Sequence, residues 1–407
     1  MMAILVATIA GLQGSAGATP AVRSGSVEGK IVYSPTTGGL SLSLGSGCIT
    51  VADALGGLMP HTDITVGRQL IRWGPGVSGS LLLSGYAPLD GLTLEADLGR
   101  FRYVQVQAAR DAAAGRWLLA HRIEGHIAPG VLAGISEAVA VSGGFRLQPC
   151  HLIPGFPYYL AQHLLLHDDR SQDRWTNVLL GVDAIVTLTK DARAYAEVMA
   201  DDFPAAPSAW GRVPRMVGGL IGVRLDAPFG CEGYQAVAEY VRIHNYVYSH
   251  KNPDNTYIIA DGRLIGHPLG PDADALYLFV KRGGREADGA QSDTAVTATI
   301  GYERHGEGHP GRAWAPADGV AHEFLSGIVE TRKIIGVTLR TGLDWGVQPR
   351  SPQTCFSQTR SAQTRATLEL SARIESIDNA RHLAGARALE GGVNLTLWLE
   401  WLPLATP

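Results

Sequence analysis

Apolar and polar residues alternate along most of the chain from Glu28 onward, and turns rich in Gly, Pro and Asp separate the alternating runs. A period of two is the pattern of a β-strand whose two faces meet different surroundings. The clearest runs lie at residues 92–98, 192–198, 217–226, 332–344, 365–375 and 393–401. The pattern therefore predicts an all-β chain.

The length of these runs separates two kinds of β protein. Strands of soluble proteins average about five or six residues, whereas a tilted strand needs about nine to eleven to cross a bilayer. Several runs reach the greater length, and polar residues of both charges, such as Arg340 and Glu369, fall at mid-strand. A water-filled lumen permits such charges, so we predict a transmembrane antiparallel β-barrel of about 14–18 strands. A soluble β protein, which would alternate in the same way, is the alternative.

Aromatic residues and composition agree with a barrel. Interfacial girdles of Trp and Tyr are typical of transmembrane strands. Candidates near the predicted strand ends are Trp117, Tyr195, Tyr246, Tyr248, Tyr277, Trp345, Trp398 and Trp401. The mean hydropathy is +0.05, a value that a helical membrane protein would exceed. The formal net charge of −4 offers no basic field for nucleic acid, which we do not expect as a partner.

Two stretches depart from the alternation. Residues 1–22 are apolar at first and lack Lys and Arg, so they are interpreted either as a signal-like segment or as a first strand. Residues 23–407 are expected to form one barrel domain. Within it, residues 128–176 break the rhythm, and 131–141 suits a short helix or a buried segment. A long non-alternating segment inside a β chain is often functional, and we predict that 128–176 is a plug-like segment with short helices.

No sequence motif points to catalysis, a cofactor or a metal. Nucleophile-elbow, zincin, P-loop and dinucleotide-binding motifs are absent from the sequence. The run His305-Gly306-Glu307-Gly308-His309 could supply three ligands, but a Gly-rich hairpin tip is the favoured interpretation. The cysteines lack the spacing of a zinc site, although one or two disulfides remain open; they are Cys48, Cys150, Cys231 and Cys355. We expect a protein that is not an enzyme. A hydrolase with a lumen-edge His/Asp/Ser site is an alternative without recognisable spacing.

Arginines are concentrated before residue 130, at Arg68, Arg72, Arg100, Arg102, Arg110, Arg116 and Arg122. A guanidinium group forms bidentate pairs with carboxylates. We expect these side chains to pair with Glu95, Asp97, Glu124, Glu137 and Glu239 and to hold a plug against the barrel wall. A surface for acidic sugars is the alternative. Residues two apart share a strand face, so Arg122, Glu124 and His126 should lie together, with His121 opposite.

The stretch from Gly67 to Pro88, GRQLIRWGPGVSGSLLLSGYAP, begins as an alternating strand and then turns at Arg72-Trp73-Gly74-Pro75-Gly76. Pro75 fixes its own φ, and the neighbouring glycines permit backbone conformations closed to other residues. Leu81–Ser84 is interpreted as a short buried element. The stretch resembles the signature of the Wzi-type outer-membrane capsule assembly family. The residues that carry the resemblance are Gly67, Arg68, Arg72, Trp73, Gly74, Pro75, Gly76, Ser84, Pro88, His121, Arg122, Glu137, Pro149, Glu239, Tyr240, Gly270, Pro271 and Asp272.

The resemblance implies a lectin-like outer-membrane barrel, with eighteen strands, that attaches or assembles capsular or other surface polysaccharide at the cell exterior. Its implied partners are that polysaccharide, outer-membrane lipid and the barrel-assembly machinery, with the protein as a monomer. Sugar contacts are expected in loops, for which 249–257, 283–292, 305–316 and 348–364 are candidates, and His309 and Trp314 are the candidate binding residues. An outer-membrane porin or specific channel is the alternative.

Overall fold

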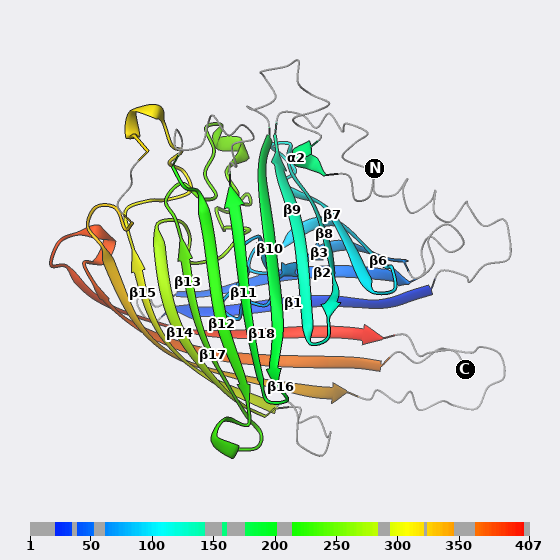
Figure 1. The fold of residues 1–407 in the computed structure, drawn as a ribbon. Coiled ribbons are helices and arrows are strands. Elements are labelled where there is room, and N and C mark those ends of the chain that lie inside the picture. The colour runs from blue at the N-terminus through cyan, green and yellow to red at the C-terminus, as the bar shows by residue number, and fades with distance from the viewer. Residues whose placement is uncertain are drawn as a thin grey trace, which may run out of the picture.

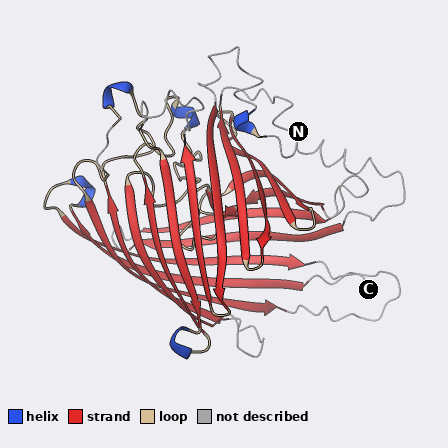
Figure 2. Ribbon diagram, viewed as in Figure 1, coloured by secondary structure: helices blue, strands red, loops and turns tan. Residues whose placement is uncertain are grey.

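The structure is a computed structural model that describes residues 21–34, 39–52, 62–142, 157–160, 176–201, 214–283, 294–320, 324–345 and 363–402. Sixteen strands close into a single antiparallel barrel (Figure 1). Two further strands, β4 and β5, form a small separate sheet within the connection between β3 and β6. The helices of the described residues are short pieces in the connections (Figure 2).

The first half of the wall contains β1 (Ala21–Ser34), β2 (Gly39–Ala52), β3 (Thr62–Gln69), β6 (Leu89–Asp97), β7 (Phe101–Asp111), β8 (Arg116–Ala128), β9 (Val131–Val141) and β10 (Thr176–Thr189). The second half contains β11 (Ala192–Asp201), β12 (Val217–Asp226), β13 (Tyr234–Ile243), β14 (Ala273–Gly283), β15 (Thr294–His305), β16 (Glu330–Trp345), β17 (Gln363–Asp378) and β18 (Arg387–Leu402). The small sheet pairs β4 (Arg72–Trp73) with β5 (Leu83–Ser84). The helical pieces are α2 (Tyr158–Leu160), η5 (Pro228–Gly230), η6 (Pro253–Asn255), η7 (Pro316–Asp318) and η8 (Ala380–His382).

Each wall strand pairs with its neighbours along the chain, and β1 pairs with β18 to complete the ring. Closure leaves no sheet edge, so every wall strand has a partner on both sides. The count of sixteen lies within the predicted range of 14–18, and it is smaller than the eighteen that the family resemblance implies. The prediction of an all-β transmembrane barrel is confirmed.

The outward face of the wall carries a continuous apolar band. Ile300, Ile335 and Ile374 lie side by side on three adjacent strands, each more than half exposed. The same face of the preceding strands presents Ile135, Val182, Val198, Ile221 and Leu276. Side chains of this kind that face away from a barrel meet lipid. Among the described residues, no helix is long and apolar enough to cross a membrane.

The two ends of the barrel differ in the length of their connections. At one end, called the turn end here, neighbouring strands are joined by residues 53–61, 98–100, 129–130, 190–191, 227–233, 284–293 and 346–362, and one of these connections, 346–362, is longer than ten residues. The first residue of β1 and the last residue of β18 are also at this end. At the opposite end, called the loop end, the connections are 35–38, 70–88, 112–115, 142–175, 202–216, 244–272, 306–329 and 379–386, and five of them have 15 residues or more.

The expectation of a non-alternating plug at 128–176 is wrong for its described N-terminal part. Residues 131–141 form wall strand β9, paired with β8 and β10 along its length. Of the rest, the structure describes Ser142, Pro157–Leu160 and the start of β10. Residues 1–20 lie outside the described residues, while Ala21 and Val22 belong to β1.

The hydrophobic core lies inside the barrel, where two loops fold into the lumen. Leu81, Leu82 and Leu83 of the 70–88 loop are at most 4% exposed. They pack with inward-facing side chains from β7 through β14 and from β16, and with residues of the 244–272 loop. These two loops therefore fill the space that residues 128–176 were expected to fill.

Candidate functional site

The 70–88 loop is held by carboxylates from the barrel wall that accept hydrogen bonds from its backbone. Glu197 on β11 is 5% exposed, and its two oxygens accept from the amides of Gly76 at 2.7 Å and Leu81 at 2.8 Å. A carboxylate makes strong hydrogen bonds with backbone N–H groups, and burial strengthens them further. One wall residue thus fixes both sides of the turn at Gly76–Leu81.

Glu239 on β13 holds the tip of the same turn. Its carboxylate accepts from the amides of Val77 at 2.6 Å and Ser78 at 2.9 Å, and from the Ser78 hydroxyl. The hydroxyl of Tyr195 on β11 donates to it at 2.7 Å. Glu239 is 1% exposed, and these four donors satisfy a charge that would otherwise be costly to bury.

His267 of the 244–272 loop meets Ser78 from the other side. Its Nδ1 accepts from the amide of Leu269 at 3.2 Å, so the ring proton lies on Nε2, 3.0 Å from the Ser78 hydroxyl oxygen. Complete burial lowers the pKa of His267 to about 3, and the ring is therefore neutral at ordinary pH. A neutral Nε2–H donates to Ser78, whose own hydroxyl proton goes to Glu239.

Glycines allow the loop to approach the wall this closely. A Cβ on Gly74, whose φ is +117°, would lie 2.5 Å from a Glu197 carboxylate oxygen. A Cβ on Gly76 would lie 2.2 Å from the carbonyl oxygen of Gly79 and 2.6 Å from Leu220. Only glycine therefore fits at these two positions, which explains the Gly-Pro-Gly sequence in physical terms.

The 244–272 loop closes over the 70–88 loop through polar contacts at its interior. The Tyr248 hydroxyl donates to the carbonyl of Leu81 at 2.6 Å and accepts from the amide of His267 at 3.0 Å. Ser84 donates its amide and its hydroxyl to the carbonyl of Ile265, both at 3.0 Å. Arg110 on β7, which is 3% exposed, secures the other side of the 244–272 loop. Its guanidinium donates to the carbonyls of Asp254, Thr256 and Ile258.

Asp272 joins the lumen loops to the next loop at the surface. Its side chain accepts from the amides of Gly308 at 3.0 Å and Ser326 at 3.1 Å, and its carbonyl accepts from Gly306 at 2.8 Å. Asp272 is fully buried at a φ of +55°, which Asp tolerates better than most residues. The 306–329 loop is thus fixed at both of its flanks.

The candidate sugar-binding residues differ in their exposure. His309 is exposed on the 306–329 loop. Trp314 is half-buried against the core, and its indole N–H donates to the carbonyl of Gly319 at 2.8 Å. Arg312 lies between them, exposed and 3.5 Å from Asp318. These residues belong to the loop end, where they form part of an outward surface.

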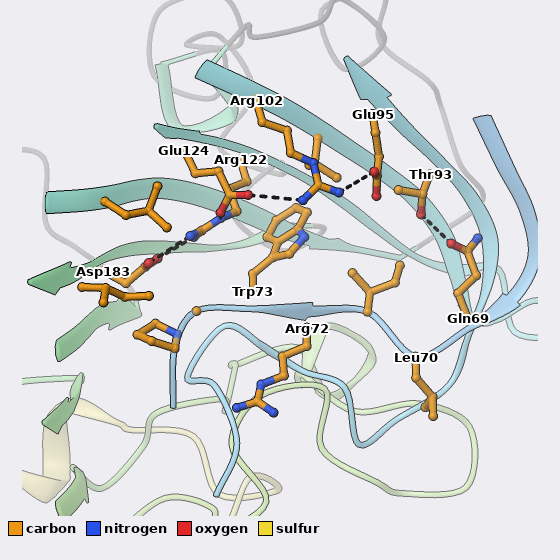
Figure 3. A pocket seen from close by; sticks show the side chains of 16 residues that line it. Gln69, Leu70, Arg72, Trp73, Thr93, Glu95, Arg102, Arg122, Glu124 and Asp183 are labelled. Atoms are coloured by element: carbon orange, nitrogen blue, oxygen red, sulfur yellow. Dashed lines mark hydrogen bonds and ion pairs between the residues drawn. The ribbon is translucent and has the colours of Figure 1, made fainter. Parts of the chain in front are cut away.

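A ladder of alternating charges crosses the lumen wall beside Trp73 (Figure 3). Arg102 on β7 pairs with Glu95 on β6 and, at 3.4 Å, with Glu124 on β8. Arg122 on β8 pairs with Glu124 at 3.0 Å, and its two terminal nitrogens donate to the two oxygens of Asp183 on β10, at 2.5 Å from Nη1 and 2.9 Å from Nη2. The predicted pairing of early arginines with Glu95 and Glu124 is confirmed.

A cavity of about 370 Å³ lies between this ladder and the 70–75 part of the 70–88 loop. The ladder forms one side, and Trp73 projects toward it from β4 (Figure 3). Gln69 and Thr93 line it next to the ladder, and the Thr93 hydroxyl donates to the side-chain amide oxygen of Gln69 at 2.9 Å. The cavity is therefore polar on the wall side and aromatic on the loop side.

The predicted ion pair of Arg72 is not present among the described residues. The Arg72 side chain is exposed and points away from the charge ladder (Figure 3). Backbone amides satisfy Glu197, and backbone amides with the hydroxyls of Ser78 and Tyr195 satisfy Glu239, so no arginine is involved. The expectation that Arg72 anchors the loop through a carboxylate is therefore wrong, because the loop is anchored through its main chain.

His121 and Glu137 lie on the opposite side of the wall from Arg122. They form a pair at 3.1 Å on the outward face of β8 and β9. The amides of Tyr158 and Tyr159 donate to the two Glu137 oxygens, and the Tyr158 ring lies 4.5 Å from the His121 ring. The α2 segment therefore covers an outward polar pair, and the predicted pairing of Glu137 with an arginine is wrong.

The remaining motif residues are spread along the barrel. Arg68 forms an exposed pair with Asp90, while Tyr240 lies on the outward face and donates to Asp274 at 3.1 Å. Gly67 belongs to β3, Pro88 directly precedes β6, and Gly270 and Pro271 lead into Asp272. Pro149 lies outside the described residues. The structure brings Glu239 and Arg122 close to the 72–78 residues, places Asp272 against the 306–329 loop, and leaves His121, Glu137, Arg68 and Tyr240 elsewhere.

Other expectations about single residues have mixed outcomes. Cys231 is a free, exposed thiol, whereas Cys150 and Cys355 lie outside the described residues. The described residues contain no group of His, Cys, Asp and Glu that could hold a metal ion. Two of the candidate sugar loops, 283–292 and 348–364, lie mostly outside the described residues. The strands that they join meet at the turn end, opposite to 249–257 and 305–316.

Sequence reasoning missed Glu197 and His267, which hold the 70–88 loop most directly. Glu197 looked like any lumen-facing charge of an alternating strand. The sequence signal lies instead in the loop that Glu197 holds. Gly74 and Gly76 indicate that another group packs closely against the backbone of this loop.

These features define an outer-membrane-type β-barrel with its lumen filled by inward-folded loops. The sequence matches no protein-family model and none of the curated proteins. Among solved structures, the chain is similar to Wzi, an outer-membrane protein involved in group 1 capsule assembly in Escherichia coli and described as a carbohydrate-binding β-barrel. The two are 12% identical with a TM-score of 0.52, over 94% of this chain and 85% of that one.

Further similar structures come from Pseudomonas aeruginosa. OccD3 (OpdP) is 8% identical with a TM-score of 0.49, over 96% of this chain and 94% of that one. The outer-membrane protein OprD is 8% identical with a TM-score of 0.42, over 95% and 93%. At such identities the likeness to Wzi shows the shared fold, and the two weaker likenesses add nothing to it.

Proposed function

We propose that this protein is a non-enzymatic barrel of the bacterial outer membrane that attaches or assembles capsular or other surface polysaccharide, with its loop end at the cell exterior. Outer-membrane barrels have short turns on the periplasmic side and longer loops outside. The difference between the two ends supports this orientation. The resemblance of the 67–88 stretch to the Wzi-type family, and the fold shared with Wzi, favour polysaccharide as the partner.

The observation that carries the proposal is the packed core in the lumen. The core continues from Val104 on β7, across the buried Leu81–Leu83 run, to Ile334 on β16. A general channel needs a water-filled path, and tightly packed side chains exclude water. A barrel filled in this way favours a role at its surface over free passage of solutes.

The 306–329 loop is the surface that we assign to polysaccharide. Asp272 fixes its flanks, so that the exposed His309 and Arg312 are displayed on an ordered base. A loop that is already ordered loses less conformational entropy on binding a ligand than a flexible loop does. The ring of Trp314 is partly buried against the core, so only part of it is accessible to polysaccharide. Trp314 contributes mainly to the shape of the loop.

The Ser78–His267–Glu239 group supports a role without catalysis. A serine nucleophile needs a histidine nitrogen that accepts its proton and a carboxylate that orients the ring. Here the nitrogen facing Ser78 carries the proton, and Glu239 bonds to the serine instead of to the histidine. The three residues form a structural hydrogen-bond chain.

A porin or specific channel is the second candidate, and the cavity of about 370 Å³ beside the charge ladder is the observation that favours it. Ion conductance through single proteins in planar lipid bilayers separates the two. The polysaccharide role expects a closed wild-type barrel, whereas a channel would give regular open steps.

Polysaccharide retention is tested by exchanging loop tips. Replacing residues 309–318 with a short Gly-Ser linker keeps Gly306, Gly308 and Ser326 on Asp272, so the barrel should fold. We expect cells to release more polysaccharide into the medium. The matched control is the same exchange at residues 349–360, whose flanking strands end at the turn end, and it should leave retention unchanged. If exchanges at 309–318 and at 250–254 both leave retention at the wild-type level, the proposed function is wrong.

A further inference from the structure

The cavity beneath Arg72–Pro75 has the size and the lining of a ligand site. Its volume of about 370 Å³ lies within the range of small-molecule sites, which is about 300–1,000 Å³. We propose that it binds a small uncharged polyhydroxylated ligand, such as one or two sugar units, that enters from the turn end. This proposal does not depend on the polysaccharide role of the loop end.

The charge ladder argues for an uncharged ligand. Three carboxylates, on Glu95, Glu124 and Asp183, face two guanidinium groups, so the ladder has a net charge of −1. Each of these two guanidinium groups already lies between two carboxylates, and the third arginine of the lining, Arg72, points away from the ladder (Figure 3). The carboxylates still have acceptor capacity, because each offers about four lone-pair positions. Such a surface accepts hydrogen bonds from hydroxyl groups and disfavours phosphate or uronate.

Trp73 argues for a ligand with both an apolar face and an acceptor. Trp73 is 7% exposed, and among the described residues no hydrogen bond forms to its indole N–H. A buried Trp N–H normally has a partner. A sugar ring supplies hydroxyl oxygens for this donor and a C–H face for the indole ring. The polar wall and the aromatic loop side thus match the two characters of one sugar unit.

The lining of the cavity extends from the 70–88 loop toward the turn end. Leu132 is the second residue of β9 and Arg102 the second residue of β7, and both strands start at that end. Residues 70–75 of the 70–88 loop line the other side of the cavity. A ligand in the cavity would therefore come from the compartment opposite to the one that the loop end faces.

Ligand binding can be measured by saturation-transfer NMR on the full-length barrel in detergent, with maltose, lactose, cellobiose and diacetylchitobiose as probes. We expect transfer to at least one of these neutral disaccharides, and none to glucuronic acid. Leu132→Trp would fill the cavity and should abolish the transfer. The matched control is Ile135→Trp, which places the same side chain on the outward face, where Ile135 is 67% exposed, and should leave it unchanged.

A milder variant covers the case in which Leu132→Trp fails to fold. Trp73→Phe keeps an aromatic ring and removes the N–H donor, and it should weaken binding by about tenfold, the effect of one lost hydrogen bond. If no neutral disaccharide binds the wild-type protein, or if binding persists in both variants, the proposal is wrong. Polysaccharide retention by cells carrying Trp73→Phe should stay at the wild-type level, so the loop-end role is judged separately.

Discussion

The carboxylate of Glu197 occupies the space that a side chain on Gly74 would need. An ideal Cβ on Gly74 would lie 2.5 Å from one carboxylate oxygen and 2.6 Å from the carboxyl carbon. The same carboxylate accepts the amide hydrogen bonds of Gly76 and Leu81. Glycine at position 74 is therefore required by Glu197, because the carboxylate reaches the amides of Gly76 and Leu81 only if residue 74 has no side chain.

Gly74→Ala tests this match. The substitution adds a clash with Glu197 to the strain of a φ of +117°, and should lower the free energy of unfolding by about 1–3 kcal/mol. Denaturant titration in detergent measures the change. Gly99→Ala is the matched control, since Gly99 also has a positive φ, of +79°, but a Cβ there meets nothing within 4 Å. Equal losses in the two variants would show that the clash contributes nothing.

Glu197→Ala removes the anchor itself. It leaves the buried amides of Gly76 and Leu81 without their acceptor, and each such group costs about 1–3 kcal/mol. We expect a less stable barrel with measurable ion conductance in planar bilayers, as the 70–88 loop is released from the wall. Asp90→Ala breaks only the exposed pair with Arg68, and serves as the control with little effect on either readout. A closed Glu197→Ala barrel of wild-type stability would contradict the anchoring role.

Arg72 and Arg122 should behave oppositely when each is replaced by alanine. Arg72 is exposed and has no ion pair among the described residues, so Arg72→Ala should change the free energy of unfolding by less than about 0.5 kcal/mol. Arg122 is 4% exposed and holds Glu124 and Asp183, so Arg122→Ala should cost about 3–5 kcal/mol. Denaturant titration compares the two. A large loss for Arg72→Ala would restore the idea that its charge anchors the loop.

The buried His267 predicts a loss of stability in mild acid. Its pKa is lowered to about 3 in the folded protein, whereas an unfolded His titrates near 6.5. Above pH 6.5 the ring is neutral in both states, and below it only the unfolded chain takes up the proton. Stability should therefore fall by about 1.4 kcal/mol per pH unit below 6.5, or about 2 kcal/mol between pH 6.5 and 5.

Denaturant titrations across this pH range, on the wild type and on His267→Gln, isolate the contribution of His267. Between pH 6.5 and 5, the free energy of unfolding of His267→Gln should fall by about 2 kcal/mol less than that of the wild type. His309→Gln changes an exposed ring and should retain the full wild-type dependence. Parallel pH profiles for the wild type and His267→Gln would show that the His267 ring is not held neutral by the fold.

The alternation of residues predicted the wall of the barrel well. Arg122 and Glu124 face the lumen and His121 faces outward, as a period of two requires. The strands run in simple sequence order, so local patterns are enough to predict their existence and their pairing. What the pattern cannot give is the set of contacts inside the lumen, because these join loops to distant strands.

Strand β9 shows why the plug was expected in the wrong place. Its inward residues Ala138 and Ala140 pack in the lumen core, while its outward residues Val139 and Val141 pack beneath Tyr158. Both faces are therefore apolar, and the alternation that marks other wall strands disappears. The sequence does indicate that a segment covers this part of the wall. His121 and Glu137 are polar residues on a face that otherwise meets lipid, so they need to be covered.

The contacts that hold the 70–88 loop also set an order of assembly. Gly76 and Glu197 are 121 positions apart, and Ser78 and His267 are 189 positions apart. Contacts of such long sequence separation form late, because much of the chain must first be ordered. The loop leaves the wall after β3, yet its partners arrive only with β11, β13 and the 244–272 loop. The barrel therefore stays hollow until most of its wall is complete, and a filled lumen marks a chain that has finished folding.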